Sequence, residues 1–429
     1  MKSAISIIFI LFFKSAVSEY VIQKIDGISG LPKAIDFDSN GNAYVAVADK
    51  NKNHQLLKIN PDKEILWGIN ITGASNINQI IINSQDVVYF DSEMRETSRR
   101  YLNILKEENL SIERIGQFQS LSYNPPMFID EEDNIFYNGY DGITLLRPNS
   151  TTPILIKNLN RYKYLDGKDF VIDSKGNIHI AVLDSLGIES TLAVVTKEAK
   201  QEETPYATHY ELNGRFLVDC LAVDQKGDAW IFAKEPMSST TYIRKLSNSN
   251  ITDIPYKDEY LCGLSKAVKD RVYVFSIPTS DVRPVPIYFW TLDGRIHQIP
   301  ELVMKQGDSG LDATIVNDKD GLTYIACFYG FQKGKVVVVK PDEGKATEIT
   351  FPDYITFVNM ILDENDDLWI VTAVSGVYRL KKGDTEAVKV TDRKEVETDL
   401  TGAISINKKT NEVFVLGNSG VYFVSNNSV

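Results

Sequence analysis

Cysteine, histidine and long apolar segments are scarce in this sequence of 429 residues. Its three cysteines, Cys220, Cys262 and Cys327, are too few for a disulfide-stapled scaffold. None lies in a Cys-x-x-Cys motif, and no two of the four histidines have the spacing of metal ligands. The chain also lacks helical heptads, a Gly-x-Ser-x-Gly nucleophile elbow and a phosphate-binding loop. A zinc-stapled domain and the familiar hydrolase motifs are therefore not expected.

The N-terminus carries one mostly apolar run, over residues 4–13, after Lys2 and before Ala16-Val17-Ser18. This run has about half of the roughly 20 apolar residues that a membrane-spanning helix needs. Small residues at Ala16 and Ser18 suit signal peptidase. We therefore predict a signal peptide over residues 1–18, secretion of the mature chain, and no membrane anchor. The remaining residues, 19–429, are predicted to form one domain.

Positive charge is also in deficit, because 46 Lys and Arg face 58 Asp and Glu and the formal net charge is −12. Binding to nucleic acid or to an anionic membrane needs a basic field, so neither is expected as a partner. An acidic surface suits a soluble extracellular protein. Five Asn-X-Ser/Thr sequons are candidates for glycosylation: Asn70, Asn109, Asn149, Asn250 and Asn426.

A hairpin pattern recurs along the chain. "AIDFDSNGNAYVAV" at 34–47 returns as "FVIDSKGNIHIAVL" at 170–183 and "MILDENDDLWIVTA" at 360–373. The Asp or Asn that begins each turn hydrogen-bonds its own downstream backbone, and Gly or Asn after it accepts a positive φ. The period is about 46 residues. We place the turn-starting residue at Asp38, Asn83, Asp130, Asp173, Asp224, Asn317, Asp363 and Asn407, with Val268 in a degenerate copy.

Each repeat contains four β-strand patterns, of which the first three are rich in β-branched and aromatic residues. Four strands per 40–50 residues is typical of a β-propeller blade, whereas a β-sandwich gives no reason for this period. The sequence therefore predicts an all-β fold: a single propeller of four-stranded blades. Nine blades follow from the nine copies, and eight is the alternative if the copy at Val268 is irregular.

The two ends of the chain complement each other. The last repeat stops after its third strand, "GVYFVS", while the strand "YVIQKI" near the N-terminus precedes the first hairpin and has no blade of its own. A ring must cover its sheet edges, so we predict that the N-terminal strand completes the last blade.

In a propeller the first strand of each blade lines the central channel, and residues just before it face the channel mouth. Polar residues at these entries are our candidate ligand-binding groups: Lys33, Asn78, Asp169, Asp219, Asp312 and Asn359. Their carboxylates and carboxamides suit a hard cation in principle, but a wide ring separates them, so we expect no cofactor, with a channel cation as the alternative. The acidic turns "DEEDN" and "DENDD" lack the spacing of an EF-hand and are interpreted as solvated.

Aromatic residues fall into two groups. Trp230 and Trp369 share a second-strand register with several tyrosines and are predicted to lie in the core between blades. Proline-rich segments at 121–128 and 283–290 instead place aromatics near strand entries, where they form candidate apolar walls for a planar ligand. Four residues of these segments complete the predicted site: Tyr123, Phe128, Tyr288 and Trp290.

The "AIDFDSNGNAYVAV"-type hairpin, repeated over nearly the whole mature chain, resembles the propellers of the senescence marker protein and gluconolactonase superfamily. It is also similar to secreted insect proteins called ommochrome-binding. The resemblance implies a propeller fold. The lactonase members hold a divalent metal with a leading Glu, whereas the first-blade entry here reads "GLPKAI", with Lys33 and no Glu.

These observations favour a secreted, non-catalytic binding protein for a small planar ligand such as a pigment. The alternatives are a metal-dependent, lactonase-like hydrolase and an extracellular protein-interaction scaffold. Cys220 and Cys262 both lie at first-strand entries of neighbouring blades, so we predict a disulfide between them. Cys327 would then remain a free thiol.

Overall fold

The structure is a computed structural model of the chain. It describes residues 20–118, 127–159, 170–183, 190–212, 216–234, 241–258, 261–268, 271–277, 285–291, 296–304, 314–327, 335–340, 346–353, 355, 357–372, 375–391, 404–418 and 420–426. The predicted signal peptide lies outside these residues. No helix within the described ranges is long and apolar enough to cross a membrane.

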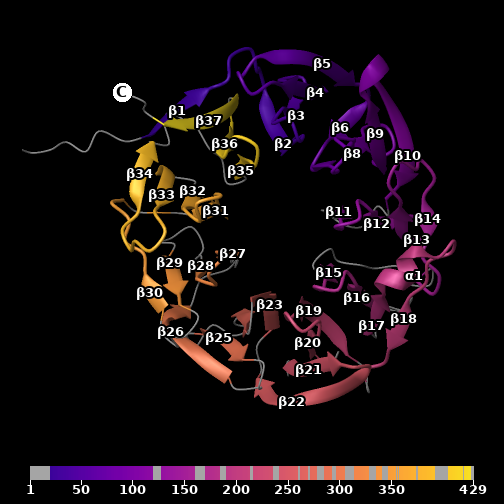
Figure 1. The fold of residues 1–429 in the computed structure, drawn as a ribbon, viewed down its shortest axis with the longest axis vertical. Coiled ribbons are helices and arrows are strands. Elements are labelled where there is room, and N and C mark those ends of the chain that lie inside the picture. The colour runs from indigo at the N-terminus through magenta and orange to yellow at the C-terminus, as the bar shows by residue number, and fades with distance from the viewer. Residues whose placement is uncertain are drawn as a thin grey trace, which may run out of the picture.

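The described strands form a ring of antiparallel sheets, eight with four strands and one with five (Figure 1). Each sheet is one propeller blade, with its first strand toward the centre of the ring and its last strand outside. Every predicted repeat therefore has its own sheet, including the degenerate copy at Val268. The all-β propeller prediction is confirmed, and the nine sheets match the nine sequence repeats.

We number the blades in chain order from the first hairpin. Blade 1 contains β2 (Leu31–Phe37), β3 (Ala43–Ala48), β4 (His54–Ile59) and β5 (Ile65–Ile71). Blade 2, with the five-stranded sheet, contains β6 (Ala74–Asn76), β7 (Ile80–Ile82), β8 (Val88–Met94), β9 (Arg100–Lys106), the 3₁₀ helix η1 (Glu107–Asn109) and β10 (Ser111–Gln117). Its inner strand is interrupted, since β6 and β7 both pair with β8.

The next three blades follow the same order. Blade 3 contains β11 (Phe128–Ile129), β12 (Ile135–Gly139), β13 (Gly142–Leu146) and β14 (Ile154–Leu155). Blade 4 contains β15 (Phe170–Ile172), β16 (Ile178–Leu183), β17 (Ser190–Val195), the short helix α1 (Lys197–Gln201) and β18 (Thr208–Tyr210). Blade 5 contains β19 (Leu217–Val223), β20 (Ala229–Lys234), β21 (Thr241–Ser247) and β22 (Asn250–Asp258).

The last four blades close the ring. Blade 6 contains β23 (Leu261–Val268), β24 (Arg271–Ile277), β25 (Val285–Thr291) and β26 (Ile296–Met304). Blade 7 contains β27 (Thr314–Asn317), β28 (Thr323–Cys327), β29 (Lys335–Val339) and β30 (Ala346–Glu348). Blade 8 contains β31 (Phe357–Leu362), β32 (Leu368–Thr372), β33 (Gly376–Leu380) and β34 (Val388–Thr391). Blade 9 contains β35 (Ile404–Asn407), β36 (Glu412–Gly417), β37 (Gly420–Asn426) and β1 (Tyr20–Lys24).

Ring closure occurs as predicted. β1 pairs antiparallel with β37, with Tyr20 opposite Asn426 and Lys24 opposite Tyr422, and it forms the outer strand of blade 9. The Tyr20 ring packs edge-on against Trp369 of blade 8, with 5.4 Å between ring centroids. The N-terminal strand therefore completes the last blade and also contacts the preceding one.

The turns between the first and second strands are built around a buried carboxylate. Asp224 Oδ1 accepts hydrogen bonds from the backbone N–H groups two and four residues downstream, and its Oδ2 accepts one of 2.9 Å from Trp230 Nε1. Asp363 repeats this arrangement with Trp369 at 3.0 Å. Each turn is thus closed by its own side chain, and its second carboxylate oxygen is joined to the second strand.

Two sequence interpretations of these turns are corrected. In blade 7 the turn begins at Asp318 rather than Asn317, since the Asp318 N–H bonds Leu322 O and its Oδ1 accepts from Leu322 N. The two acidic turns are not solvated throughout, because Asp363, Asp366 and Asp367 of "DENDD" and Asp130 and Asn134 of "DEEDN" are buried. Hydrogen bonds and neighbouring cations compensate the desolvation of these carboxylates.

Core side chains pack between neighbouring blades. One cluster joins Leu192 and Val194 of blade 4 to Leu221 and Ile231 of blade 5, and similar clusters occur at other junctions. Trp230 and Trp369 are almost completely buried, as the second-strand register predicted. Burial of apolar surface between sheets is the main stabilising contribution to such a ring.

Candidate functional site

The predicted channel-mouth residues are only partly described by the structure. Asp169, Asp312 and Tyr123 lie outside the described residues. Asp219 lies in β19, and Tyr288 and Trp290 lie in β25, where only the backbone is described. A shared site made by all of these groups is therefore still a prediction.

The predicted residues that are described have separate local roles. Lys33 is exposed on β2. The Asn78 side chain and backbone N–H both donate to Asp91, at 2.8 Å each, and Asp91 is buried. Asn359 Oδ1 accepts from the backbone N–H of Met360. The two carboxamides therefore stabilise local structure.

Phe128 also has a structural role. Its ring stacks on Phe136 of the adjacent strand, with centroids 5.1 Å apart and an interplanar angle of 12°. It packs against the core cluster between blades 3 and 4. Phe128 is therefore part of the blade packing, and a ligand wall at this segment is not needed to explain it.

The sequons and the cysteines are placed as follows. Asn70, Asn109, Asn149 and Asn250 are exposed, which is compatible with glycan attachment, and Asn426 lies in β37. Cys220 lies in β19 and Cys262 in β23, which contact one another between blades 5 and 6. The disulfide stays a prediction, because the side chains of both cysteines are outside the described part.

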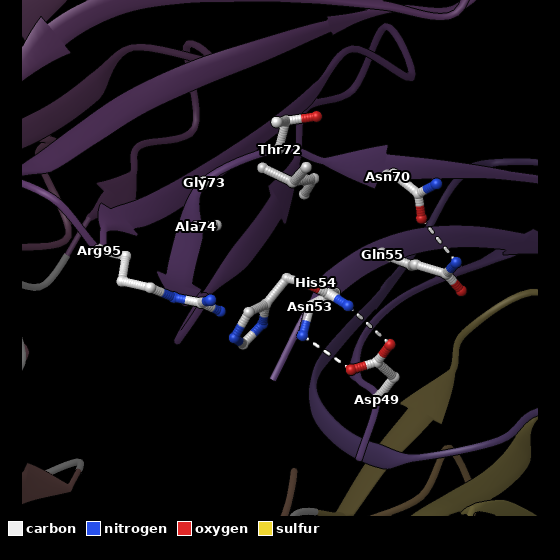
Figure 2. A pocket seen from close by; sticks show the side chains of 10 residues that line it. Asp49, Asn53, His54, Gln55, Asn70, Thr72, Gly73, Ala74 and Arg95 are labelled. Carbon is white, nitrogen blue, oxygen red and sulfur yellow. Dashed lines mark hydrogen bonds between the residues drawn. The ribbon is translucent and has the colours of Figure 1, made fainter. Parts of the chain in front are cut away.

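A cavity of about 410 Å³ lies at the junction of blades 1 and 2 (Figure 2). Its wall is formed by the β3–β4 turn, the start of β4, the end of β5 with the connection to β6, and the residue after β8. The lining residues are Asp49, Asn53, His54, Gln55, Asn70, Ile71, Thr72, Gly73, Ala74 and Arg95. Because strands alternate in direction, these segments share the face of the ring at which first strands begin.

His54 is the most unusual group in this cavity. It is 2% exposed, and its Nε2 lies 2.9 Å from the carbonyl oxygen of Ser75. A carbonyl only accepts hydrogen bonds, so Nε2 carries the proton and Nδ1 presents a lone pair. Nδ1 is buried and has no hydrogen-bond partner. An unsatisfied buried acceptor costs about 1–3 kcal/mol.

The electrostatic surroundings keep His54 neutral. Burial lowers the pKa of His54, and the positive charges of Lys33 and Arg95 lower it further, although the hydrogen bond to Ser75 acts in the opposite direction. In Figure 2 the Arg95 side chain reaches toward the His54 ring from blade 2. One Arg95 nitrogen, Nη2, donates to Lys52 O at 2.8 Å. The guanidinium is thus held at the cavity.

Hydrogen bonds also order the opposite wall. Asn53 donates to Asp49 through both its backbone and its side chain, at 2.8 and 3.0 Å. Hydrogen bonds from Asn53 lower the pKa of Asp49, so its carboxylate is charged at neutral pH. Gln55 Nε2 donates to Asn70 Oδ1 at 2.6 Å (Figure 2). The cavity therefore offers a cation, an anion and planar amides in fixed positions.

The sequence pattern did not point to this cavity, because the candidate residues were those immediately before each first strand. The cavity residues belong instead to the turn after the second strand and to the end of the fourth. The available signal was His54 at the start of a buried third strand. The histidines were considered only for the spacing of metal ligands.

No protein-family model matches the sequence, and no curated protein matches it. Among solved structures, dipeptidyl peptidase 4 from Porphyromonas gingivalis is similar with a TM-score of 0.54 at 8% identity, covering 90% of this chain and 63% of that one. Virginiamycin B lyase from Staphylococcus aureus aligns with a TM-score of 0.41 at 12% identity, covering 95% and 98% of the two chains. Oligogalacturonate lyase from Vibrio parahaemolyticus gives 0.43 at 11%, covering 93% and 98%.

At these identities the comparisons concern fold alone. The structural neighbours are β-propellers, which agrees with the architecture described above. The resemblance to the gluconolactonase superfamily is supported only at the level of the propeller fold, by the ring of sheets described above.

Proposed function

We propose that the chain is an exported, non-catalytic binding protein that takes a small ligand into the cavity between blades 1 and 2. The observation that carries this proposal is the buried, unpartnered Nδ1 of His54 in a cavity of about 410 Å³. Ligand sites in proteins have volumes of this order and a few convergent polar groups. Export is proposed from the pattern of residues 1–18.

The cavity chemistry selects the kind of ligand. Arg95 favours an anionic or strongly accepting group, while the neutral His54 ring favours a hydroxyl or N–H donor. The amide groups of Gln55 and Asn70 can form hydrogen bonds with further polar groups of a ligand. A planar, hydroxylated aromatic acid combines these features, and it fits the small planar ligand, such as a pigment, that the sequence favoured.

The proposal is tested on protein from a non-glycosylating bacterial host, so that Asn70 carries no glycan. Ligand-detected NMR against a panel of hydroxylated aromatic acids identifies binders, and titration gives their dissociation constants. Arg95→Ala should weaken binding by about tenfold or more, the usual effect of a lost charge-assisted hydrogen bond. Arg99→Ala, in the same exposed turn, is the matched control and should leave binding unchanged.

Three outcomes would overturn the proposal. Equal binding by the Arg95→Ala and Arg99→Ala variants would exclude this cavity as the site. Lack of binding across the panel, together with a partner retained in pull-down, would favour a protein-interaction scaffold. Chelator-sensitive hydrolysis of a lactone would favour an enzyme. Purification from the native source adds a direct check, because a bound pigment gives the protein a visible absorption band.

A further inference from the structure

A second cluster of polar groups lies at the junction of blades 7 and 8, on the opposite face of the ring from the cavity. Asp318 and Asp320 belong to the β27–β28 turn, and Asp366 belongs to the β31–β32 turn. One carboxylate oxygen from each lies within 4.8 Å of the other two. Asp318 and Asp366 are buried, whereas Asp320 is exposed. The cluster is therefore buried at Asp318 and Asp366 and open to solvent at Asp320.

Asp318 differs from the corresponding acids of other blades. In blades 4, 5 and 8 the second oxygen of this carboxylate accepts from a second-strand side chain: His179 at 3.1 Å, Trp230 at 2.9 Å and Trp369 at 3.0 Å. Asp318 is 2% exposed, yet its Oδ2 has no hydrogen-bond partner. This buried oxygen lies 3.9 Å from the ammonium of Lys382, which pairs with the other two acids. Because no group of the turn donates to this oxygen, its partner is expected to be a ligand from outside the turn.

Lys382, in the turn after β33, places its ammonium among the three acids. Its Nζ lies 2.5 Å from Asp320, 2.9 Å from Asp366 and 3.9 Å from Asp318 Oδ2, the last beyond hydrogen-bond distance. The four side chains together carry a charge of −2, from three carboxylates and one ammonium. The single Lys382 ammonium therefore does not neutralise the negative charge of the three carboxylates.

We propose that Asp318, Asp320 and Asp366 bind a divalent cation, and that the Lys382 ammonium occupies the same place when the cation is absent. Calcium fits best, because ions held at 2.3–2.6 Å can share oxygens up to about 5 Å apart and accept water as the remaining ligands. The flexible, partly exposed Lys382 stem allows the ammonium to move out to solvent. The bound ion would join two neighbouring blades.

The test uses the full mature chain, freed of metal with a chelator, titrated with CaCl₂ in a calorimeter at constant ionic strength. We expect one calcium per chain and a rise in melting temperature with calcium concentration. MgCl₂ should bind more weakly, because magnesium requires shorter, octahedral coordination. Absence of calcium binding would overturn the proposal.

Variants separate the site from non-specific binding by acidic turns. Asp320→Asn, at an exposed position that folding tolerates, should weaken calcium binding about tenfold or more. Lys382→Met should strengthen it by about tenfold or more, because the competing ammonium is removed. Asp384→Asn, at an exposed acid in the same turn as Lys382, is the matched control and should have no effect. Calcium binding that none of the three variants changes would place the ion elsewhere and refute the assignment.

Discussion

The side-chain amide of Asn407 donates a 2.8 Å hydrogen bond to the carbonyl oxygen of Gly41, across 366 positions of sequence. It joins the turn of blade 9 to the turn of blade 1. Lys63 of blade 1 reinforces this junction through a 2.8 Å ion pair with Glu412 of blade 9. The first and last repeats therefore meet through the same kind of turn-to-turn contact that joins Ser39 of blade 1 to Asp86 of blade 2.

Ring closure predicts a large effect of N-terminal truncation. Deleting residues 19–26 removes β1, exposes the edge of β37 and uncovers Trp369. We expect the melting temperature to fall by several degrees, since the loss of a whole strand costs several kcal/mol and a domain of about 400 residues loses roughly 1 °C per kcal/mol. Differential scanning calorimetry measures the change. Lys24→Ala, an exposed position at the end of β1, is the control, and equal melting of the truncated and full-length proteins would contradict the closure.

The link between second strand and turn is tested at Trp230. Replacing Trp230 with Phe keeps an aromatic ring in the core but removes the Nε1 donor to Asp224 Oδ2. The buried carboxylate then loses a partner, so the free energy of unfolding should fall by about 1–3 kcal/mol. Urea denaturation followed by fluorescence measures it. Trp67→Phe, at a half-buried outer-strand position, should cost less. A smaller loss at Trp230 than at Trp67 would refute this role.

The pH dependence of stability is tested at Asp173. Burial disfavours its charged form, but hydrogen bonds from His179 and Asn177 outweigh burial and lower the pKa of Asp173 to about 2. An unfolded Asp titrates near 3.9, so the folded state gains stability from ionised Asp173 above about pH 4. This contribution is lost as pH falls through about 2.

Asp173→Asn should therefore be less stable than the natural protein at pH 7, and the difference should shrink as the pH falls from 4 toward 2. Urea denaturation at a series of pH values gives the two curves. Asp62→Asn, at an exposed position, provides the control curve. A difference that stays constant down to pH 2 would show that Asp173 does not contribute through its charge.

Backbone conformation is tested at two glycines with positive φ. Gly227 in the blade 5 turn has φ +82°, and a Cβ there would lie 3.2 Å from Asp173 Oδ2 of blade 4. Gly383 has φ +86°, and no atom lies within 4 Å of its added Cβ. Alanine at either position should cost about 1–2 kcal/mol through backbone strain. Gly227→Ala should cost more, because it also crowds a carboxylate. Chemical denaturation compares them, and equal losses would exclude the steric component.

The sequence by itself determined the features that depend on local interactions. The turn at Asp224 is closed by hydrogen bonds two and four residues away, so its pattern is visible in any copy of the repeat. Four strand patterns in each repeat predicted the propeller blade. The spare strand at the N-terminus and the missing fourth strand of the last repeat predicted how the ring closes. These conclusions need no knowledge of which blades touch.

Only the tertiary structure decided the features that neighbouring blades build together. Asn317 and Asp318 are adjacent polar residues, and the hydrogen bonds of the folded turn select Asp318 as its start. The cavity at His54 needs Arg95 from the next blade, and the acidic cluster needs Asp366 from the blade after Asp318. Residues about 40–50 positions apart meet there because each sheet packs face to face on the next. A repeat pattern predicts that blades are neighbours, but the side chains that meet between them depend on their packed geometry.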